Sequence, residues 1–194
     1  MKIAVTGGSG FIGQRLVKRL EKAGHQIVNI DSEDPDNPID ICYEQALEKS
    51  LEGCDAIYHL AAAHRDDISP KSIYYDVNGQ GTKNIIQAAK AHNIQRIIFA
   101  STVAVYGLNA GEASEETKPE PFNDYGKSKL EAEQYLKAWQ SESDDHILSI
   151  IRPVVVFGEG NRGNVYTLMK QIAGNKFIMI GKGQNKKSMA YVEN

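Results

Sequence analysis

The chain has 194 residues, of which 41% are hydrophobic and 24% charged, and its formal net charge is -3. A chain of this length can bury one sizeable core, and its charge provides no broad positive field for nucleic acid or an anionic membrane surface. We therefore exclude nucleic acid and membrane as partners and expect a small-molecule ligand.

The elements predicted from the sequence alternate between short strands and longer helices. The first three are a strand over residues 2–6, a helix over 11–23 and a strand over 26–30. Further strands are predicted over 56–60, 96–100 and 147–151, and helices over 72–92 and 125–140. This alternation predicts a parallel sheet in a doubly wound α/β fold of the Rossmann type.

The remaining segments are predicted as loops or as a short C-terminal portion. Residues 32–37 and 109–122 are rich in proline, glycine and acidic residues, which is typical of surface loops. From Val165 onward we expect one helix, a short strand over 177–180 and a glycine-containing loop.

The two cysteines, Cys42 and Cys54, show neither a disulfide framework nor the short spacing of metal ligands. We therefore expect no metal site. The chain also lacks a run of about 18 apolar residues and the features of a secretory signal. These observations predict a cytoplasmic protein.

Three glycines follow the first predicted strand at intervals of three, in the segment TGGSGFIG. Gly7, Gly10 and Gly13 lack side chains, so backbone N–H groups here, including those of Phe11 and Ile12, can face a pyrophosphate. The spacing alone is a weak signal, but the strand before it and the helix after it make it a dinucleotide-binding pattern.

Asp31 directly follows the second predicted strand, where a carboxylate can accept both hydroxyls of an adenosine ribose. Neither Ser32 nor Glu33 supplies an arginine for a 2′-phosphate, so we expect NAD rather than NADP. Asp40 and Ile41 can border the adenine, although an exposed loop aspartate explains Asp40 almost as well.

Further along the chain, hydroxyl and amine groups lie at positions where open α/β sheets bind their ligands. Ser101 and Thr102 end a strand, although they can equally satisfy backbone groups there. Tyr125 and Lys129 are four residues apart at the start of a helix and share one face. Residues 166 and 170 repeat this Tyr/Lys spacing, so spacing alone does not identify the pair.

The order of these motifs resembles that of the extended short-chain dehydrogenase/reductase family, the group of nucleotide-sugar epimerases and dehydratases. GxxGxxG is followed by HLAA at residues 59–62 and VNGQGT at 77–82, and the resemblance extends to about residue 192. It implies that Leu60, Ala61 and Ala62 line the cofactor channel and that Asn78 braces the active-site backbone. It also places Ser101 and Arg152 beside the cofactor.

By this resemblance Thr102, Tyr125 and Lys129 form a catalytic triad, because Tyr125 precedes the Arg152-Pro153 strand as the family requires. A free tyrosine, with a pKa near ~10, is a poor base at neutral pH. An ammonium at ~6 Å stabilises the phenolate by about 3 kcal/mol. We therefore expect Lys129 to lower the pKa of Tyr125 and to hold the nicotinamide ribose, while Thr102 hydrogen-bonds the reacting oxygen.

Val103 and Ala104 stand where dehydratases of the family carry acidic residues, so the range of expected reactions does not include dehydration. We expect NAD-dependent epimerisation of a nucleotide sugar, with UDP-sugars favoured, through a transient keto sugar. Two alternatives stay open: an NAD-dependent reductase or dehydrogenase, which the segment RPVVVFG also suits, and a dinucleotide-sensing module without catalysis.

Two positions depart from the epimerase pattern. Val155 stands where those enzymes use an asparagine to contact the nucleotide diphosphate, and Lys187 replaces an arginine, which gives up bidentate phosphate recognition. Asn161, Arg162 and Asn164 can serve the diphosphate instead, although a solvated turn explains these residues equally well.

We assign residues 1–160 to an NAD-binding Rossmann domain with the triad and 161–194 to the start of a substrate-binding portion. Because family members continue beyond this point, we expect this chain to bind NAD but to turn substrate over poorly. The resemblance also implies a homodimer through the helices at 72–92 and 125–140. The apolar stripes of these helices suit a monomer core equally well.

Overall fold

The computed structural model describes residues 1–108, 112–179, 181–184 and 186–194. The chain divides into two compact units, Met1–Arg152 and Pro153–Asn194, and each is described by itself. The second unit therefore includes residues 153–160, which were predicted to belong to the first domain.

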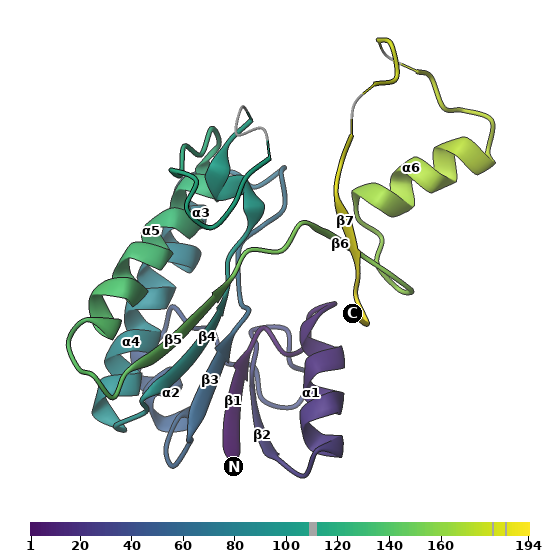
Figure 1. The fold of residues 1–194 in the computed structure, drawn as a ribbon. Helices are drawn as coiled ribbons and strands as arrows, with labels where there is room; N and C mark the ends of the chain where they lie inside the picture. Colours follow the sequence, from purple (N-terminus) through teal and green to yellow (C-terminus); the bar gives the residue numbers. More distant parts are fainter. Residues whose placement is uncertain (109–111, 180, 185) are drawn as a thin grey trace. The chain divides into compact units, whose positions relative to one another are not determined.

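The first unit is built on a five-stranded parallel sheet in the order β2-β1-β3-β4-β5 (Figure 1). The strands are β1 (Lys2–Thr6), β2 (Gln26–Ile30), β3 (Ala56–His59), β4 (Arg96–Ala100) and β5 (Ile147–Ile151). All five were predicted, and β3 is one residue shorter than expected. The chain leaves β1 for β2 on one side and returns to β3 on the other, which creates the switch point where open sheets bind ligands.

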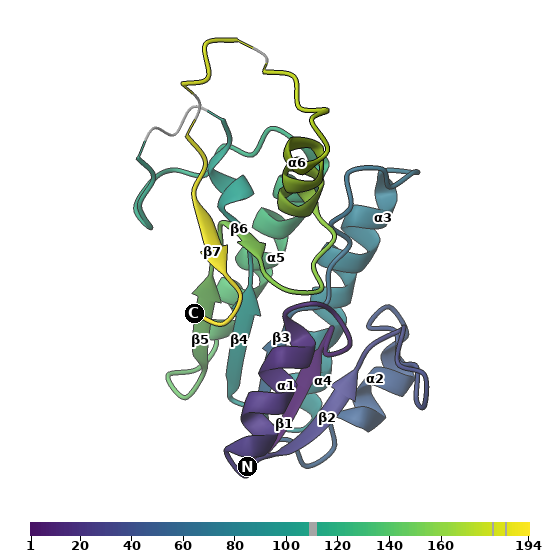
Figure 2. The same ribbon diagram turned by 90° about the vertical axis from the view of Figure 1, so that its right-hand side faces the viewer.

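Helices cover both faces of this sheet, which confirms the doubly wound α/β prediction. One face carries α1 (Gly13–Lys22), and the other carries α2 (Glu44–Ser50), α4 (Gly81–Ala91) and α5 (Asp124–Gln140) (Figures 1 and 2). The side chain of Asn123 accepts a 2.8 Å hydrogen bond from the Gly126 N–H and so caps α5. The seven-residue α2 was not predicted.

The predicted helix over residues 72–92 is continuous but not uniform. It begins as α3 (Ser72–Tyr74), widens into the π-helix η1 (Tyr75–Gln80) and continues as α4. A π-helix bonds each residue to the fifth along the chain and is often found at functional sites. The apolar pattern of the sequence does not distinguish this turn from an α-helix.

The core of the first unit lies between the sheet and α2, α4 and α5. Trp139, Phe99 and Leu136 are among its largest fully buried side chains. The apolar residues of α4 and α5 face this layer, as the 3.6-residue period of an amphipathic helix requires.

The second unit contains β6 (Val155–Phe157) paired in parallel with β7 (Met189–Tyr191), and α6 (Asn164–Ala173). Phe157 and Tyr191 pack with ring centroids 5.8 Å apart. The strand predicted over 177–180 is wrong for Phe177–Met179, which have no regular structure, because no other strand of the described residues pairs with them. Ile180 lies outside the described residues.

Both predicted loops are irregular where the structure describes them. Residues 32–37 and 112–122 contain neither helix nor strand, while 109–111 lie outside the described part. Within that part, no helix has the length and apolar character needed to cross a membrane. In the same residues, no three His, Cys, Asp or Glu side chains come together as metal ligands.

Candidate functional site

The predicted site residues gather at one edge of the sheet. Because its five strands are parallel, the residues that follow them share the carboxyl edge. These residues are Gly7, Asp31, Leu60, Ser101 and Arg152. The topology therefore brings together positions that are up to 145 residues apart in the sequence numbering.

The turn after β1 is packed too closely for side chains. Gly7 has φ +72°, and a Cβ there would lie 2.7 Å from the Ala61 nitrogen. A Cβ on Gly13 would lie 2.1 Å from the Gly7 oxygen. Gly10 donates a 3.1 Å hydrogen bond to that same oxygen. The three glycines thus allow β1, the turn and the start of α1 to approach one another.

The start of α1 is left open to an anion. Its N-cap position, Ile12, makes no side-chain capping bond, and its first turn contains no acidic residue. No hydrogen-bond acceptor is found for the backbone N–H groups of Phe11, Ile12 and Gly13 among the described residues. Free N–H groups at a helix N-terminus attract negative charge, so this turn fits the pyrophosphate of a dinucleotide.

Asp31 connects the end of β2 to the glycine turn. One carboxylate oxygen accepts a 2.9 Å hydrogen bond from the Ser9 N–H, and the other accepts one of the same length from the Glu33 N–H. Because each carboxylate oxygen has a further lone pair, Asp31 can still accept ribose hydroxyls. Its position beside the turn fits the predicted role.

Asp40 and Ile41 form a short turn before α2. The Asp40 carboxylate accepts a 2.9 Å bond from the Cys42 N–H. Ile41 is buried, and its carbonyl accepts a 2.9 Å bond from the Asn84 side chain. Of the pair, Asp40 is the more accessible to a ligand.

The loop after β3 is attached to the end of β1. The N–H groups of Leu60 and Ala61 donate to the Thr6 hydroxyl over 3.2 and 3.1 Å. Ala62 follows in the same loop. Through Ala61 this loop also forms the wall against which Gly7 packs.

Asn78 lies in the π-helix and joins this loop to α5. Its side chain exchanges hydrogen bonds of 2.9 and 3.0 Å with the Ala63 backbone and donates a 2.9 Å bond to the Ser128 hydroxyl. Ser128 in turn donates to the Tyr125 carbonyl over 2.9 Å. Asn78 thus braces the backbone on both sides of the candidate site.

Thr102 follows β4, and Tyr125 and Lys129 lie in the first two turns of α5. Thr102 lies beside the Tyr125 phenol, and its side chain accepts a 3.1 Å hydrogen bond from the Ala104 N–H. The Tyr125 ring packs on Tyr74 with centroids 6.3 Å apart. The Lys129 ammonium lies 4.0 Å from the centroid of the Phe99 ring.

Lys129 was expected to lower the pKa of Tyr125, and this expectation is wrong. Burial raises the pKa of the Tyr125 phenol above the ordinary value, although the neighbouring Thr102 side chain acts in the opposite direction. Burial also lowers the pKa of Lys129 to about 7, despite the nearby Glu133 carboxylate. The expected ammonium effect is absent because desolvation of both groups outweighs it.

The burial of Lys129 predicts a pH-dependent stability. Between its pKa of about 7 in the folded chain and the ordinary 10.5, the unfolded chain holds a proton that the folded chain has lost. The free energy of unfolding should therefore rise with pH in this window, by up to about 1 kcal/mol per pH unit. Urea titrations of the wild type and Lys129→Met across this window measure the effect. Parallel pH profiles for the two proteins would contradict it.

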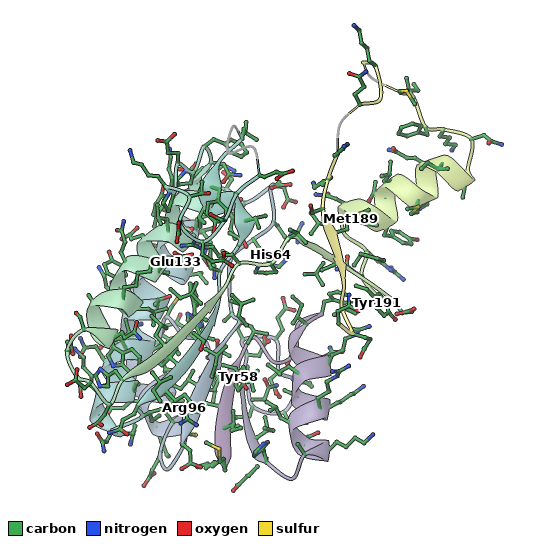
Figure 3. All side chains as sticks on the ribbon, viewed as in Figure 1. Tyr58, His64, Arg96, Glu133, Met189 and Tyr191 are labelled. Carbon is green, nitrogen blue, oxygen red and sulfur yellow. The ribbon has the colours of Figure 1, made fainter. Side chains whose placement is uncertain are left out.

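Glu133 was not identified in the sequence, yet it supports the site from α5 (Figure 3). Its buried carboxylate accepts a 2.6 Å bond from the Ser101 hydroxyl and bonds of 2.9 and 2.6 Å from Arg152. Arg152 also donates to the Tyr106 hydroxyl over 2.6 Å. This arrangement holds the end of β4, and therefore Thr102, against α5. In the sequence, Glu133 could have been noticed because it lies one helical turn after Lys129 on the same helix.

Replacing Glu133 by Gln should lower the free energy of unfolding by about 3 kcal/mol, because it removes one partner of a buried, bidentate ion pair. The matched control is Glu142→Gln, since Glu142 pairs with Lys90 at 2.7 Å but the two side chains are 47% and 37% exposed. That control should change stability by less than about 1 kcal/mol. Urea unfolding compares them, and equal losses would contradict the supporting role of Glu133.

The same variant has a predicted pH signature. The pKa of Glu133 is held below its ordinary value of 4.5 by hydrogen bonds from Arg152 and Ser101, which outweigh the effect of burial. Its contribution is therefore present above pH 4.5 and is lost as the pH falls through the folded-state pKa. The stability difference between wild type and Glu133→Gln should narrow in acid.

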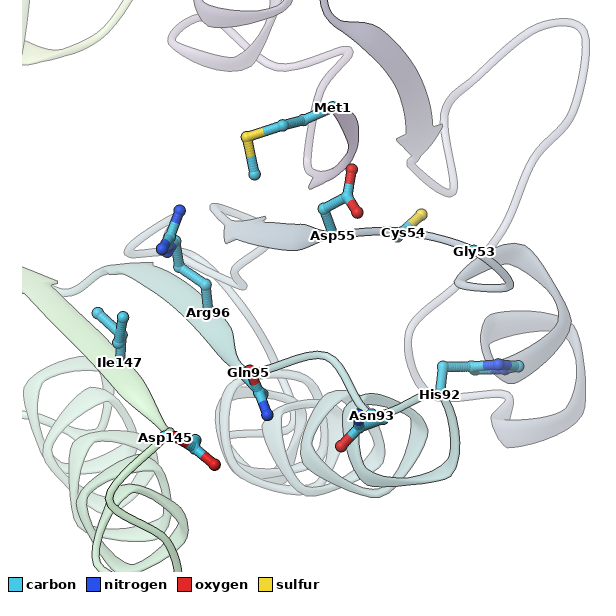
Figure 4. Close-up of a pocket in the computed structure, with 10 residues that line it drawn as sticks. All are labelled: Met1, Gly53, Cys54, Asp55, His92, Asn93, Gln95, Arg96, Asp145 and Ile147. Carbon is cyan, nitrogen blue, oxygen red and sulfur yellow. The ribbon is translucent and has the colours of Figure 1, made fainter.

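A separate hollow of about 400 Å³ lies at the opposite, amino edge of the sheet (Figure 4). Its lining includes Met1, Asp55, Arg96 and Ile147, and none of the predicted site residues. The hollow is therefore distinct from the candidate site.

The parallel sheet, the open glycine turn and the neighbouring Thr102 and Tyr125 side chains define an α/β protein of the dinucleotide-binding, short-chain dehydrogenase/reductase type. The chain belongs to the NAD dependent epimerase/dehydratase family, which it matches over residues 3–194.

Individual relatives agree with this assignment. The chain is 49% identical to the N-acetyl-alpha-D-glucosaminyl-diphospho-ditrans,octacis-undecaprenol 4-epimerase of Escherichia coli O157:H7, over 99% of this chain and 60% of that protein. It is 33% identical to the UDP-glucose 4-epimerase of Vibrio cholerae, over 99% of this chain and 63% of that one. The chain thus spans about three fifths of the length of these relatives.

A solved structure shows the same fold. The UDP-glucuronic acid 4-epimerase from Bacillus cereus, in complex with NAD, superposes with a TM-score of 0.86 at 30% identity. The match covers all of this chain and 70% of that one. This structural match and the family match therefore each include residues of both units.

Proposed function

We propose that this chain binds NAD and that the whole protein epimerises a sugar attached to a diphosphate, through a transient keto sugar. The observation that carries the proposal is that Thr102 lies beside the Tyr125 phenol, with Lys129 buried one helical turn along α5, at the same sheet edge as an uncapped helix N-terminus. The names of the relatives and of the NAD complex support the same reaction class.

The proposed NAD site extends along the carboxyl edge of the sheet. Its residues are Gly7, Gly10, Phe11, Ile12, Gly13, Asp31, Asp40, Ile41, Leu60, Ala61, Ala62, Asn78, Ser101, Tyr125, Lys129 and Arg152. Since Ser101 and Arg152 already bond to Glu133, we propose that these two act by holding Thr102 in place. The Asp31 carboxylate would repel a 2′-phosphate, so NADP should bind much more weakly than NAD.

When bound, NAD supplies the group that accepts a hydride from the sugar and returns it. Tyr125 accepts the proton of the sugar hydroxyl, while Thr102 holds the reacting oxygen by a hydrogen bond. Because burial raises the pKa of Tyr125 in the free chain, proton transfer requires positive charge beside the phenol. Lys129 supplies part of that charge when it is protonated, and it also orients the nicotinamide ribose.

Two kinds of carrier are candidates for the group that bears the sugar, a nucleotide diphosphate and a polyprenyl diphosphate. A UDP-sugar agrees with the UDP-glucose 4-epimerase of Vibrio cholerae and the UDP-glucuronic acid 4-epimerase. A polyprenyl-diphosphate sugar is favoured by the 49% identical relative, whose name specifies an undecaprenol carrier.

The test is a substrate panel given to the whole protein with NAD. UDP-, dTDP-, GDP- and CDP-sugars are compared with polyprenyl-diphosphate sugars, and both epimer formation and absorbance of reduced nicotinamide are followed. Reversible epimer formation without net reduction supports the proposal. Net formation or consumption of reduced nicotinamide indicates a dehydrogenase or reductase instead, and NAD binding without turnover of any substrate indicates a sensing module.

We further propose that the whole protein is a cytoplasmic homodimer that pairs through the continuous helix of α3, η1 and α4 and through α5. Light scattering coupled to size exclusion measures the assembly directly. A monomer at assay concentration would contradict the dimer without affecting the proposed reaction.

A further inference from the structure

A chain of buried polar groups runs through the first unit between β1 and α5. Its side chains come from Thr6, His59, Thr82, Asn78 and Ser128, and each is at most 1% exposed. Buried polar groups are stable only when they are hydrogen-bonded, so the proton positions in this chain are constrained. The proposed reaction gives His59 and Thr82 no role.

The proton of each hydroxyl can be assigned from its partners. Thr82 donates to the Asn78 carbonyl over 2.6 Å, so its oxygen must accept from His59 Nε2, 3.0 Å away. The Thr6 oxygen accepts from two backbone N–H groups, which fills both lone pairs. Its proton is therefore directed at His59 Nδ1, 2.7 Å away.

Only one form of His59 satisfies these partners. Its Nε2 carries a proton and its Nδ1 accepts one, which is the neutral Nε2–H tautomer. A second ring proton would point at the Thr6 hydroxyl, whose lone pairs are already occupied. The groups around the ring are Thr6 from β1, Phe99 from β4, Thr82 from α4 and Lys129 from α5, and burial, followed by the Lys129 charge, lowers the pKa of His59 to about 3.

The bonds then run in one direction from the cofactor loop to the catalytic helix. Ala61 donates to Thr6, Thr6 to His59, and His59 to Thr82, which donates to the Asn78 carbonyl. The Asn78 side chain continues through Ser128 to the Tyr125 carbonyl. At one end Ala61 packs on Gly7, and at the other lies the backbone of Tyr125.

We propose that His59 is a positioning residue: as the neutral Nε2–H tautomer it fixes the loop that packs on Gly7 relative to the helix that carries Tyr125. The inference rests on the proposed function, because it assigns these two segments to opposite sides of one NAD site. It predicts that hydroxyl groups, rather than side-chain shape, are required at positions 6 and 82.

The first test is ¹⁵N NMR of the histidine rings in the wild-type chain. His59 should show a protonated Nε2, an unprotonated Nδ1 and no titration between about pH 5 and 8. A protonated Nδ1, or a titration in this range, would overturn the proposal. This measurement does not depend on NAD binding.

The second test compares Thr6→Val, which keeps the shape and loses the hydroxyl, with Thr6→Ser, which keeps the hydroxyl. The valine variant, which loses the bonds of the Thr6 hydroxyl to His59 and to the loop, should bind NAD about tenfold more weakly, and the serine variant should restore binding. Thr82→Val and Thr82→Ser provide a second pair if Thr6→Val does not fold. Ser50→Ala, which loses a 2.6 Å bond to the Leu47 carbonyl outside this chain of groups, controls for general loss of stability.

Two results separate this inference from the proposed function. If the valine variants bind NAD as tightly as the wild type, the positioning role of His59 is overturned and the NAD site stands. If the wild type shows the expected tautomer but binds no NAD, the proposed function fails, and the positioning role fails with it.

Discussion

Tyr125→Phe should reduce the proposed epimerase turnover of the whole protein by about 10³-fold, because in the proposed mechanism it removes the group that accepts the sugar proton. The substitution keeps the aromatic ring, which packs on Tyr74 at a centroid distance of 6.3 Å. NAD affinity should therefore change little. Steady-state rates and a cofactor titration measure the two effects separately.

The chain contains its own control for this variant. Tyr166 has the same four-residue spacing to Lys170 but lies on α6 in the second unit, where it is 46% exposed. Tyr166→Phe should leave turnover within about twofold of the wild type, as expected for an exposed side chain. If Tyr125→Phe kept full activity, the catalytic assignment would be wrong.

Gly7→Ala should weaken NAD binding by about 100-fold, the penalty expected when a binding segment moves by about 1 Å. A Cβ at this position would lie 2.7 Å from the Ala61 nitrogen and 2.9 Å from its Cα, so either the glycine turn or the loop after β3 must move. Equilibrium titration with NAD measures the loss, and circular dichroism confirms that the variant is folded.

Gly24→Ala separates this close contact from backbone strain. Gly24 has φ +85°, close to the +72° of Gly7, but no atom lies within 4 Å of a Cβ built there. Both variants should lose about 1 kcal/mol of stability from the left-handed backbone conformation. Only Gly7→Ala should lose NAD affinity as well, and an equal loss in both variants would show that contact with Ala61 is unimportant.

The sequence predicts the sheet well because each strand is a short β-branched run between helical or polar segments. The strands at Lys2–Thr6, Gln26–Ile30 and Arg96–Ala100 have the predicted bounds. The parallel arrangement follows from their alternation with helices, and it places the strand-end residues at one edge. The position of the candidate site therefore follows from local patterns.

Features that depend on tertiary burial are not predicted. Glu133 resembles the other charged residues of α5 until Arg152, on a separate strand end, pairs with it in the interior. The pKa of Tyr125 is also governed by burial, which no spacing reveals. The segment at 177–179 has the apolar composition of a strand but lacks a partner in the described chain, so composition alone is misleading there.

The wide turn at Tyr75–Gln80 allows one continuous helix to face two different partners. An α-helix advances by about 100° per residue, so an extra residue in one turn rotates everything before it relative to everything after it. The later part can therefore keep Ile85 and Ala89 in the core while the earlier part keeps Tyr74 against Tyr125. The backbone of this turn sets the angle between the two faces, so the packed core fixes the orientation of the helix segment that contacts the Tyr125 ring.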